Sequence, residues 1–113
     1  MDNIMIPWGE GEIEIAATFG AALKLEAPFG RSFAQIALLI EDNAMQFDHW
    51  LIMLKIAMDT NGDIKSTPAE RRDLMTEEWG TVAIKLTAWF MRCVEPQLKK
   101  MSAAASSVTP EGA

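Results

Sequence analysis

Four oxygen-bearing side chains between residues 59 and 70 have a spacing that could bind calcium. Asp59, Asn61, Asp63 and Glu70 occupy positions 1, 3, 5 and 12 of a twelve-residue loop, the positions that supply oxygen ligands in an EF-hand. Position 6 of such a loop normally requires glycine for a sharp turn, but this chain has Ile64 there. A solvated turn followed by a helix cap explains the same residues. We therefore predict no metal site and keep a calcium-regulated binding protein as an alternative.

Residues able to act as a base or a nucleophile are few and scattered. His49 is the only histidine and has no nucleophile motif beside it, so we interpret it as a helix-start residue. Cys93 is the only cysteine, and its place on an apolar stripe predicts a buried structural thiol. Glu12 and Glu14 would lie on one exposed face of a strand, with no neighbour suited to acid–base work. The sequence thus predicts no catalytic residue, no cofactor and a binding protein rather than an enzyme.

Length and charge narrow the class of protein. A chain of 113 residues suits one domain with a modest core. The net charge is −6, with ten acidic and three basic side chains in residues 1–63, and that half would repel a nucleic-acid backbone. The most apolar stretch, residues 50–58, is interrupted by Lys55 and is far shorter than the roughly 20 residues that span a bilayer. We expect a soluble, cytoplasmic protein that binds neither nucleic acid nor membrane.

The first half of the chain changes its hydrophobic period once. Ile13 and Ile15 alternate with glutamates, which predicts a short edge or hairpin strand. A helical period begins after Thr18, the expected N-cap, and should stop at Pro28 and Gly30. A second helix, capped by Ser32, is expected over residues 33–40.

The second half is helical throughout. Asp48 is the expected cap of a helix over residues 49–58, which is apolar on nearly every side and should be central. Thr67, Pro68 and Glu70 predict a capping box that opens a polar surface helix. Gly80 is expected to mark a break or a close contact before the last helix.

The last helix carries Val82, Leu86 and Trp89 on its apolar side and should pack against residues 50–58. Pro96 should weaken it, and the small polar residues that follow predict disorder. The predicted fold is mainly α, a small helical bundle of four to five helices with a short N-terminal β-strand or hairpin. It forms one domain over residues 1–101, followed by a disordered tail over residues 102–113.

Three residues are candidates for contact with a partner protein. Trp8 and Trp79 lie outside the clear apolar stripes, and Met45 lies near one. Methionine both fills cores and makes adaptable contacts in grooves that bind helices. We select Trp8, Met45 and Trp79 as candidate partner-binding residues, with the alternative that the two tryptophans cover the ends of the core.

The segment over residues 8–33 resembles small phage tail proteins of the gene-transfer-agent type. A Trp-Gly-acidic-Gly turn precedes the strand, and Gly20, Leu23, Leu25 and Glu26 approximate the stretch GxLxxLE that follows a strand in that family. The later order of elements is also similar, so the resemblance covers residues 8–95. This chain departs from the family where alanine replaces the first leucine of the stretch and where the loop over residues 59–67 is acidic.

The resemblance implies a tail assembly chaperone of a phage, prophage or gene-transfer agent. Such a protein covers the long apolar helices of the tape-measure protein until tail tube subunits polymerise around it. The implied partners are the tape-measure protein and the tail tube protein, in the cytoplasm of the bacterial host, and self-association is left open. A structural tail tube or head-tail component of the virion is the alternative.

Overall fold

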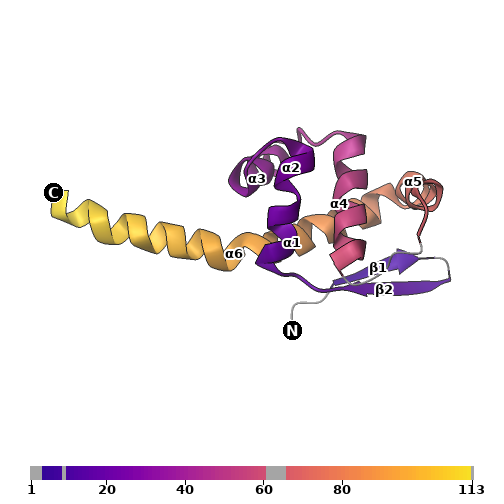
Figure 1. Cartoon of the computed structure of the whole chain (residues 1–113), viewed down its shortest axis with the longest axis horizontal. Helices are drawn as coiled ribbons and strands as arrows, with labels where there is room; N and C mark the ends of the chain where they lie inside the picture. The colour runs from indigo at the N-terminus through magenta and orange to yellow at the C-terminus, as the bar shows by residue number, and fades with distance from the viewer. Residues whose placement is uncertain (1–3, 9, 61–65, 113) are drawn as a thin grey trace.

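The computed structural model describes residues 4–8, 10–60 and 66–112, with side chains for all of them except residue 60 and residues 102–112. Two antiparallel strands, β1 (Ile4–Trp8) and β2 (Gly11–Ile15), precede the helices. The helices are α1 (Phe19–Lys24), α2 (Glu26–Phe29), α3 (Phe33–Glu41), α4 (Phe47–Thr60), α5 (Pro68–Glu77) and α6 (Trp79–Gly112). Figure 1 shows α6 along the longest axis of the molecule, crossed by α1 and α4, with α5 at its start. The described part of the chain thus has the predicted mainly α fold with an N-terminal hairpin.

The hairpin buries one row of isoleucines and leaves its glutamates in solvent. Ile4 pairs with Ile15 and Ile6 with Ile13, while Glu12 and Glu14 are exposed. This confirms the predicted alternation in β2, and of the two predicted alternatives, a single strand or a hairpin, the structure has the hairpin. The partner strand β1 carries a weak signal in the sequence, because Pro7 cannot donate a ladder hydrogen bond and is tolerated only at a sheet edge.

Local capping signals set the boundaries of most helices. The Thr18 side chain accepts a hydrogen bond from the backbone N–H of Ala21 at 3.2 Å, and both Ser32 and Thr67 form capping boxes. The structure thus confirms the helix caps predicted at Thr18, Ser32 and Thr67. Pro28 lies inside α2, and the helix ends only at Gly30, whose φ of 64° is left-handed.

The start of α4 differs from the prediction. The helix begins at Phe47, so Asp48 lies in its first turn, where a negative charge favours the helix dipole. The N-terminal hydrogen bond is made instead by His49, whose Nδ1 accepts from the backbone N–H of Gln46 at 3.0 Å. His49 thus accepts a hydrogen bond from a backbone N–H three residues earlier, as the Glu or Gln of a capping box does. The ring of His49 also stacks on Phe29, with centroids 4.9 Å apart.

Replacing His49 should therefore separate its two contributions to stability. His49→Ala removes the cap and the ring contact, and we expect it to lower the free energy of unfolding by about 1–2 kcal/mol. His49→Gln keeps an acceptor that can reach the same N–H, so it should lose roughly half as much. Urea unfolding of both variants measures the difference. Equal losses in the two variants would show that the hydrogen bond contributes nothing.

The core lies where α4 and the first half of α6 meet the hairpin. Trp89, Phe90 and Leu86 of α6 are fully buried, as are Met53 and other residues of α4. Trp89 also donates from Nε1 to the backbone oxygen of Ala16 at 2.9 Å, which joins α6 to the end of the hairpin. The predicted packing of the last helix on residues 50–58 is confirmed.

The boundary before α6 and the end of α6 both differ from expectation. The backbone breaks at Glu78 (φ −120°, ψ 34°), whereas Gly80 lies within α6, and a Cβ on Gly80 would meet no atom within 4 Å. The backbone continues as a helix through Pro96 to Gly112, where we expected a disordered tail over residues 102–113. Consecutive alanines at 103–105 have the highest helix propensity, which favours this continuation. Among the described helices, none is long and apolar enough to cross a membrane.

Candidate partner-binding surface

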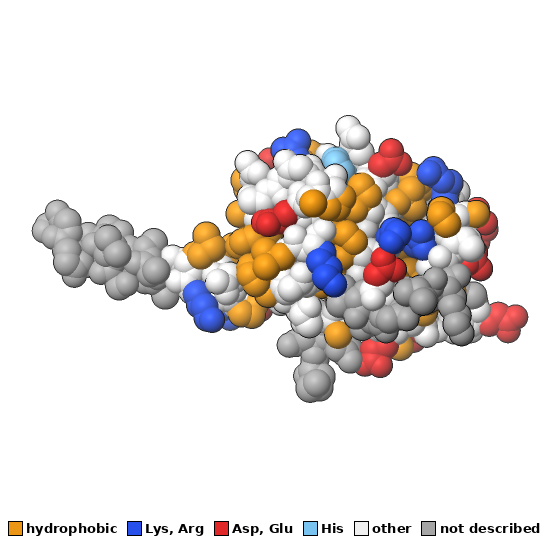
Figure 2. Space-filling model, in the orientation of Figure 1, with side chains coloured by type: hydrophobic (Ala, Val, Ile, Leu, Met, Phe, Trp, Pro, Cys, Tyr) orange, Lys and Arg blue, Asp and Glu red, His pale blue; other side chains and the backbone are white. Residues whose placement is uncertain are grey.

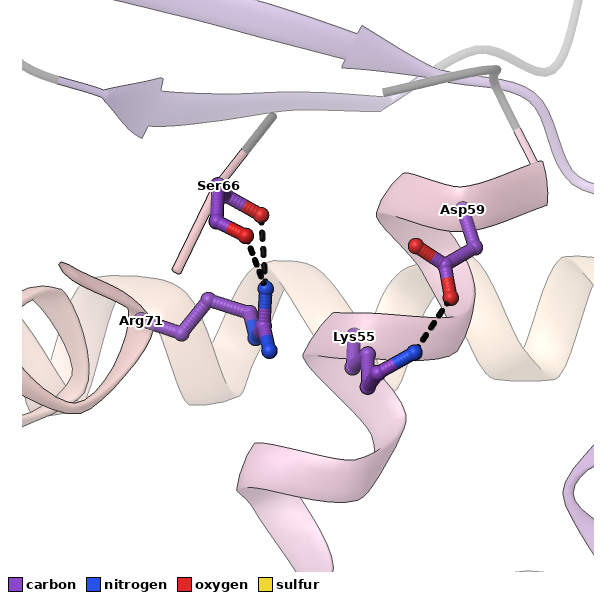
Figure 3. Close-up of polar contacts among 4 residues, drawn as sticks. All are labelled: Lys55, Asp59, Ser66 and Arg71. Carbon is purple, nitrogen blue, oxygen red and sulfur yellow. Dashed lines mark hydrogen bonds and ion pairs between the residues drawn. The ribbon is translucent and has the colours of Figure 1, made fainter. Parts of the chain in front are cut away.

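Asp59 and Glu70, the two ends of the calcium-like loop in the sequence, both bond to other residues of the chain. Lys55 Nζ forms an ion pair with Asp59 Oδ2 at 2.7 Å (Figure 3), and Glu70 Oε1 accepts from the backbone N–H of Thr67 at 2.8 Å. Asn61 and Asp63 lie outside the described residues. Within the described ranges, no three His, Cys, Asp or Glu side chains are grouped so that they could hold a metal ion.

Among the described residues, Arg71 is a charged side chain that is buried and hydrogen-bonded. Arg71 is 8% exposed, and one of its guanidinium nitrogens donates to the backbone oxygen of Ser66 at 2.9 Å and to Ser66 Oγ at 2.7 Å. Figure 3 shows this side chain reaching back from α5 to the segment before it. Hydrogen bonds to a charged donor are the stronger kind, so the contact fixes where α5 enters the fold. We interpret Arg71 as a structural residue.

Cys93 is a buried thiol, as the sequence predicts. It is 2% exposed among Trp89, Phe90 and Val94 of the core. Desolvation by burial raises the pKa of Cys93 from 9.0 to about 12, against a smaller opposing effect of a backbone hydrogen bond at Thr18. The neutral thiol is therefore the form that the folded state favours, and it is a poor nucleophile.

Two outcomes follow for the Cys93 thiol. At pH 8 the native thiolate fraction should be about a thousandfold below that of the unfolded chain, so disulfide reagents should label Cys93 only after unfolding. Because the folded pKa is raised, its stabilising effect is complete below pH 9 and is lost as the pH rises toward 12. The loss approaches about 1.4 kcal/mol per pH unit. Cys93→Ala, which should lack this part of the alkaline slope, is the control in urea unfolding across that range.

Met45 and Trp79 lie together at an apolar groove. A hollow of about 440 Å³ opens between α3, α4 and α6 at these two residues. A second hollow of about 400 Å³ includes the same two residues, so they stand between the two. We call the combined surface the Trp79 groove. Its lining residues are Ile40, Asn43, Met45, Phe47, Trp50, Met75, Thr76, Trp79, Gly80, Ala83, Ile84 and Thr87.

Aromatic contacts hold Trp79 in place although it is 42% exposed. Its ring stacks on Phe47 with centroids 5.8 Å apart and meets Trp50 edge to face at 5.9 Å. A tryptophan that is already ordered and only half covered loses little side-chain entropy when a partner covers the rest. Such residues are frequent anchors of protein interfaces.

The turn after α3 carries Met45 to the groove. Asn43 has a left-handed φ of 55°, a conformation that asparagine tolerates better than most residues. The backbone N–H of Ala44 donates to the oxygen of Leu39 at 2.8 Å, and that of Asn43 donates to Ile40 at 3.1 Å. This pair of bonds is a Schellman motif, and it fixes the direction in which the chain leaves α3.

A second apolar groove continues from the first. It has a volume of about 490 Å³, lies between α3 and α6, and shares Ile40 with the Trp79 groove. We call it the Met91 groove; its lining residues are Ala34, Ala37, Leu38, Ile40, Glu41, Met91 and Leu98. Figure 2 shows hydrophobic side chains at the surface where α6 leaves the body of the molecule.

Three exposed residues of this surface were not among the candidates selected from the sequence. Ile84 is 72% exposed, Leu38 55% and Met91 39%. The sequence does contain a signal for this surface, because the apolar residues Ile84, Met91 and Leu98 recur every seven residues and so share a side of α6. It was hidden by the stronger stripe of Val82, Leu86 and Trp89, which faces the core.

Trp8, the third candidate, lies on a different surface. It is half-buried beside a groove of about 370 Å³ between β1 and α5. We call this the acidic groove; its lining residues are Pro7, Trp8, Glu70, Asp73, Leu74, Glu77 and Glu78. The structure therefore joins Met45 with Trp79 and separates both from Trp8.

Comparison of the chain with protein-family models, with curated proteins and with solved structures gives no match.

Proposed function

We propose that this protein binds an apolar α-helix of a partner protein along the Trp79 and Met91 grooves. The observation that carries the proposal is the continuous apolar face that these grooves form, with Trp79, Ile84 and Met91 all exposed on it. Large exposed apolar patches on soluble domains commonly mark interaction sites.

The dimensions of this face favour a helix as the occupant. The lining residues of α6 extend from Trp79 to Leu98, which is about 28 Å at 1.5 Å per residue. The opposite wall is supplied by α3, which contributes Ala37, Leu38 and Ile40. Two helical walls around an apolar trough suit a partner that presents apolar residues at positions i, i+3, i+4 and i+7.

The composition of the face favours a partner that is recognised by its hydrophobicity. Met45 and Met91 line the two grooves with side chains that are not fully buried, and unbranched methionine side chains adapt to differently shaped ligands. Met75 also borders the Trp79 groove, but it is fully buried. Met53 and Met58 are buried core residues instead. We propose that the partner is a tape-measure protein and that the chain is a tail assembly chaperone. This identity of the partner is supported by the sequence resemblance over residues 8–95.

Co-expression tests the proposal. A helical fragment of the tape-measure protein encoded near this gene should be insoluble when expressed alone, and it should remain soluble and co-purify when this chain is present. Failure of every helical tape-measure fragment to co-purify would reject the assignment as a chaperone. Mass spectrometry of purified particles distinguishes the alternative, because a structural tail component is retained in the finished particle and a chaperone is absent from it.

A further inference from the structure

The two ends of the molecule carry opposite charge that finds no partner within the described chain. At one end, Asp73, Glu77 and Glu78 line the acidic groove and make no side-chain hydrogen bond or ion pair with described residues. At the other end, Lys99 and Lys100 are exposed on α6 and are likewise unpaired among the described residues. Figure 2 shows red side chains, with some blue ones among them, at the hairpin and α5 end, and blue ones beside the projecting part of α6.

The acidic side chains share one face of α5. Asp73 and Glu77 are four residues apart, and Leu74 lies next to them, so these residues face the hairpin together. Trp8 provides an aromatic wall in the same groove. The groove thus combines an indole, which attracts cations and methionine sulfur, with carboxylates that attract cations.

The basic end has the complementary set of groups. Lys99 and Lys100 are followed by Met101, which is 51% exposed. Arg92 lies seven residues before Lys99, on the same side of the helix, and is also exposed. Figure 1 shows this part of α6 projecting beyond the rest of the fold.

The chain cannot bring its own two ends together. The acidic groove adjoins the start of α6, whereas Lys99 is about 30 Å farther along this helix at 1.5 Å per residue. A straight helix cannot fold back over that distance. A second copy of the chain can supply the missing charge, because every copy carries both surfaces.

We infer that this protein self-associates head to tail, with the Lys99–Lys100 side of α6 from one copy seated in the acidic groove of the next. The contact is heterologous, so a dimer still has a free groove on one copy and a free helix end on the other, and the assembly grows beyond a dimer. Because ion pairs at a surface dominate the contact, association is weakened by salt. The inference does not rest on the proposed function, since the acidic groove and the Trp79 groove are separate.

Charge reversal tests the inference by sedimentation velocity over a range of concentrations in low and high salt. The wild-type chain should assemble with rising concentration in low salt and dissociate in high salt. Lys99→Glu with Lys100→Glu, or Asp73→Lys with Glu77→Lys, should each weaken association about tenfold or more, because like charges then face each other. The variant that combines all four substitutions restores opposite charges across the contact, and it should assemble again.

Asp42→Lys with Asp48→Lys is the control for net charge, because it changes the charge as Asp73→Lys with Glu77→Lys does, and neither residue lines the acidic groove or lies on α6. It should assemble as the wild type does. Circular dichroism checks that each variant is folded. A wild-type chain that stays monomeric in low salt would overturn the inference. So would assembly that survives both charge reversals, or a combined variant that is folded and remains monomeric.

Discussion

Replacing Trp89 with alanine is expected to lower the free energy of unfolding by about 3–5 kcal/mol, the usual loss for a fully buried tryptophan. Trp89 is completely buried, and its Nε1–H donates to Ala16 across the fold at 2.9 Å. The substitution removes both the indole volume and the hydrogen bond that joins α6 to the hairpin. Since small domains are stable by only about 5–15 kcal/mol, this variant should be close to unfolding at room temperature. Urea unfolding followed by circular dichroism measures the loss.

Two matched variants identify the cause of that loss. Trp89→Phe keeps an aromatic ring but removes the N–H donor, so it should lose about half as much. Trp79→Ala removes a tryptophan that is 42% exposed, and it should lower stability by only about 1 kcal/mol. If Trp89→Ala were no more destabilising than Trp79→Ala, the core described around α6 would be incorrect.

Trp79→Ala should affect partner binding much more strongly than it affects stability. We expect it to weaken capture of an apolar helix about 30-fold or more, the effect of removing a central aromatic anchor worth about 2 kcal/mol. Trp79 lies between the two hollows of the Trp79 groove, and its contacts with Phe47 and Trp50 hold it ready for a ligand. Isothermal titration of the tape-measure fragment that co-purifies with this chain measures the change.

The neighbouring glycine provides an independent test of the same groove. Gly80 lines the groove, and a Cβ there would meet no atom within 4 Å, so Gly80→Leu begins in open space and adds volume to the groove. It should weaken helix capture while stability is kept or raised, because leucine favours a helix over glycine. Trp8→Ala is the control, since Trp8 lies in the acidic groove. Equal loss of binding in Trp8→Ala and Trp79→Ala would place the helix site elsewhere.

Much of the fold could be read from short stretches of sequence. The caps at Thr18, Ser32 and Thr67 depend on side chains that bond to backbone three residues away, so local sequence is sufficient to identify them. The same holds for the alternation in β2. The cap predicted at Asp48 was wrong, because α4 starts earlier, at Phe47, and the hydrogen bond at its start is made by His49.

Only part of the candidate binding site could be predicted from the sequence. Met45 and Trp79 were selected individually, but 34 positions separate them, and no local pattern states that they meet. Leu38 and Met91 were not selected for the same reason, because a residue becomes part of a groove only when another element supplies the opposite wall.

The sequence by itself determined the helical class, the strand β2, the buried thiol and the charge asymmetry, since these follow from composition and from periods of two and 3.6 residues. Tertiary structure alone decided which apolar residues remain uncovered and which charges remain unpaired. Both depend on how α3, α5 and the hairpin pack beside α6, and therefore on contacts between residues far apart in the chain.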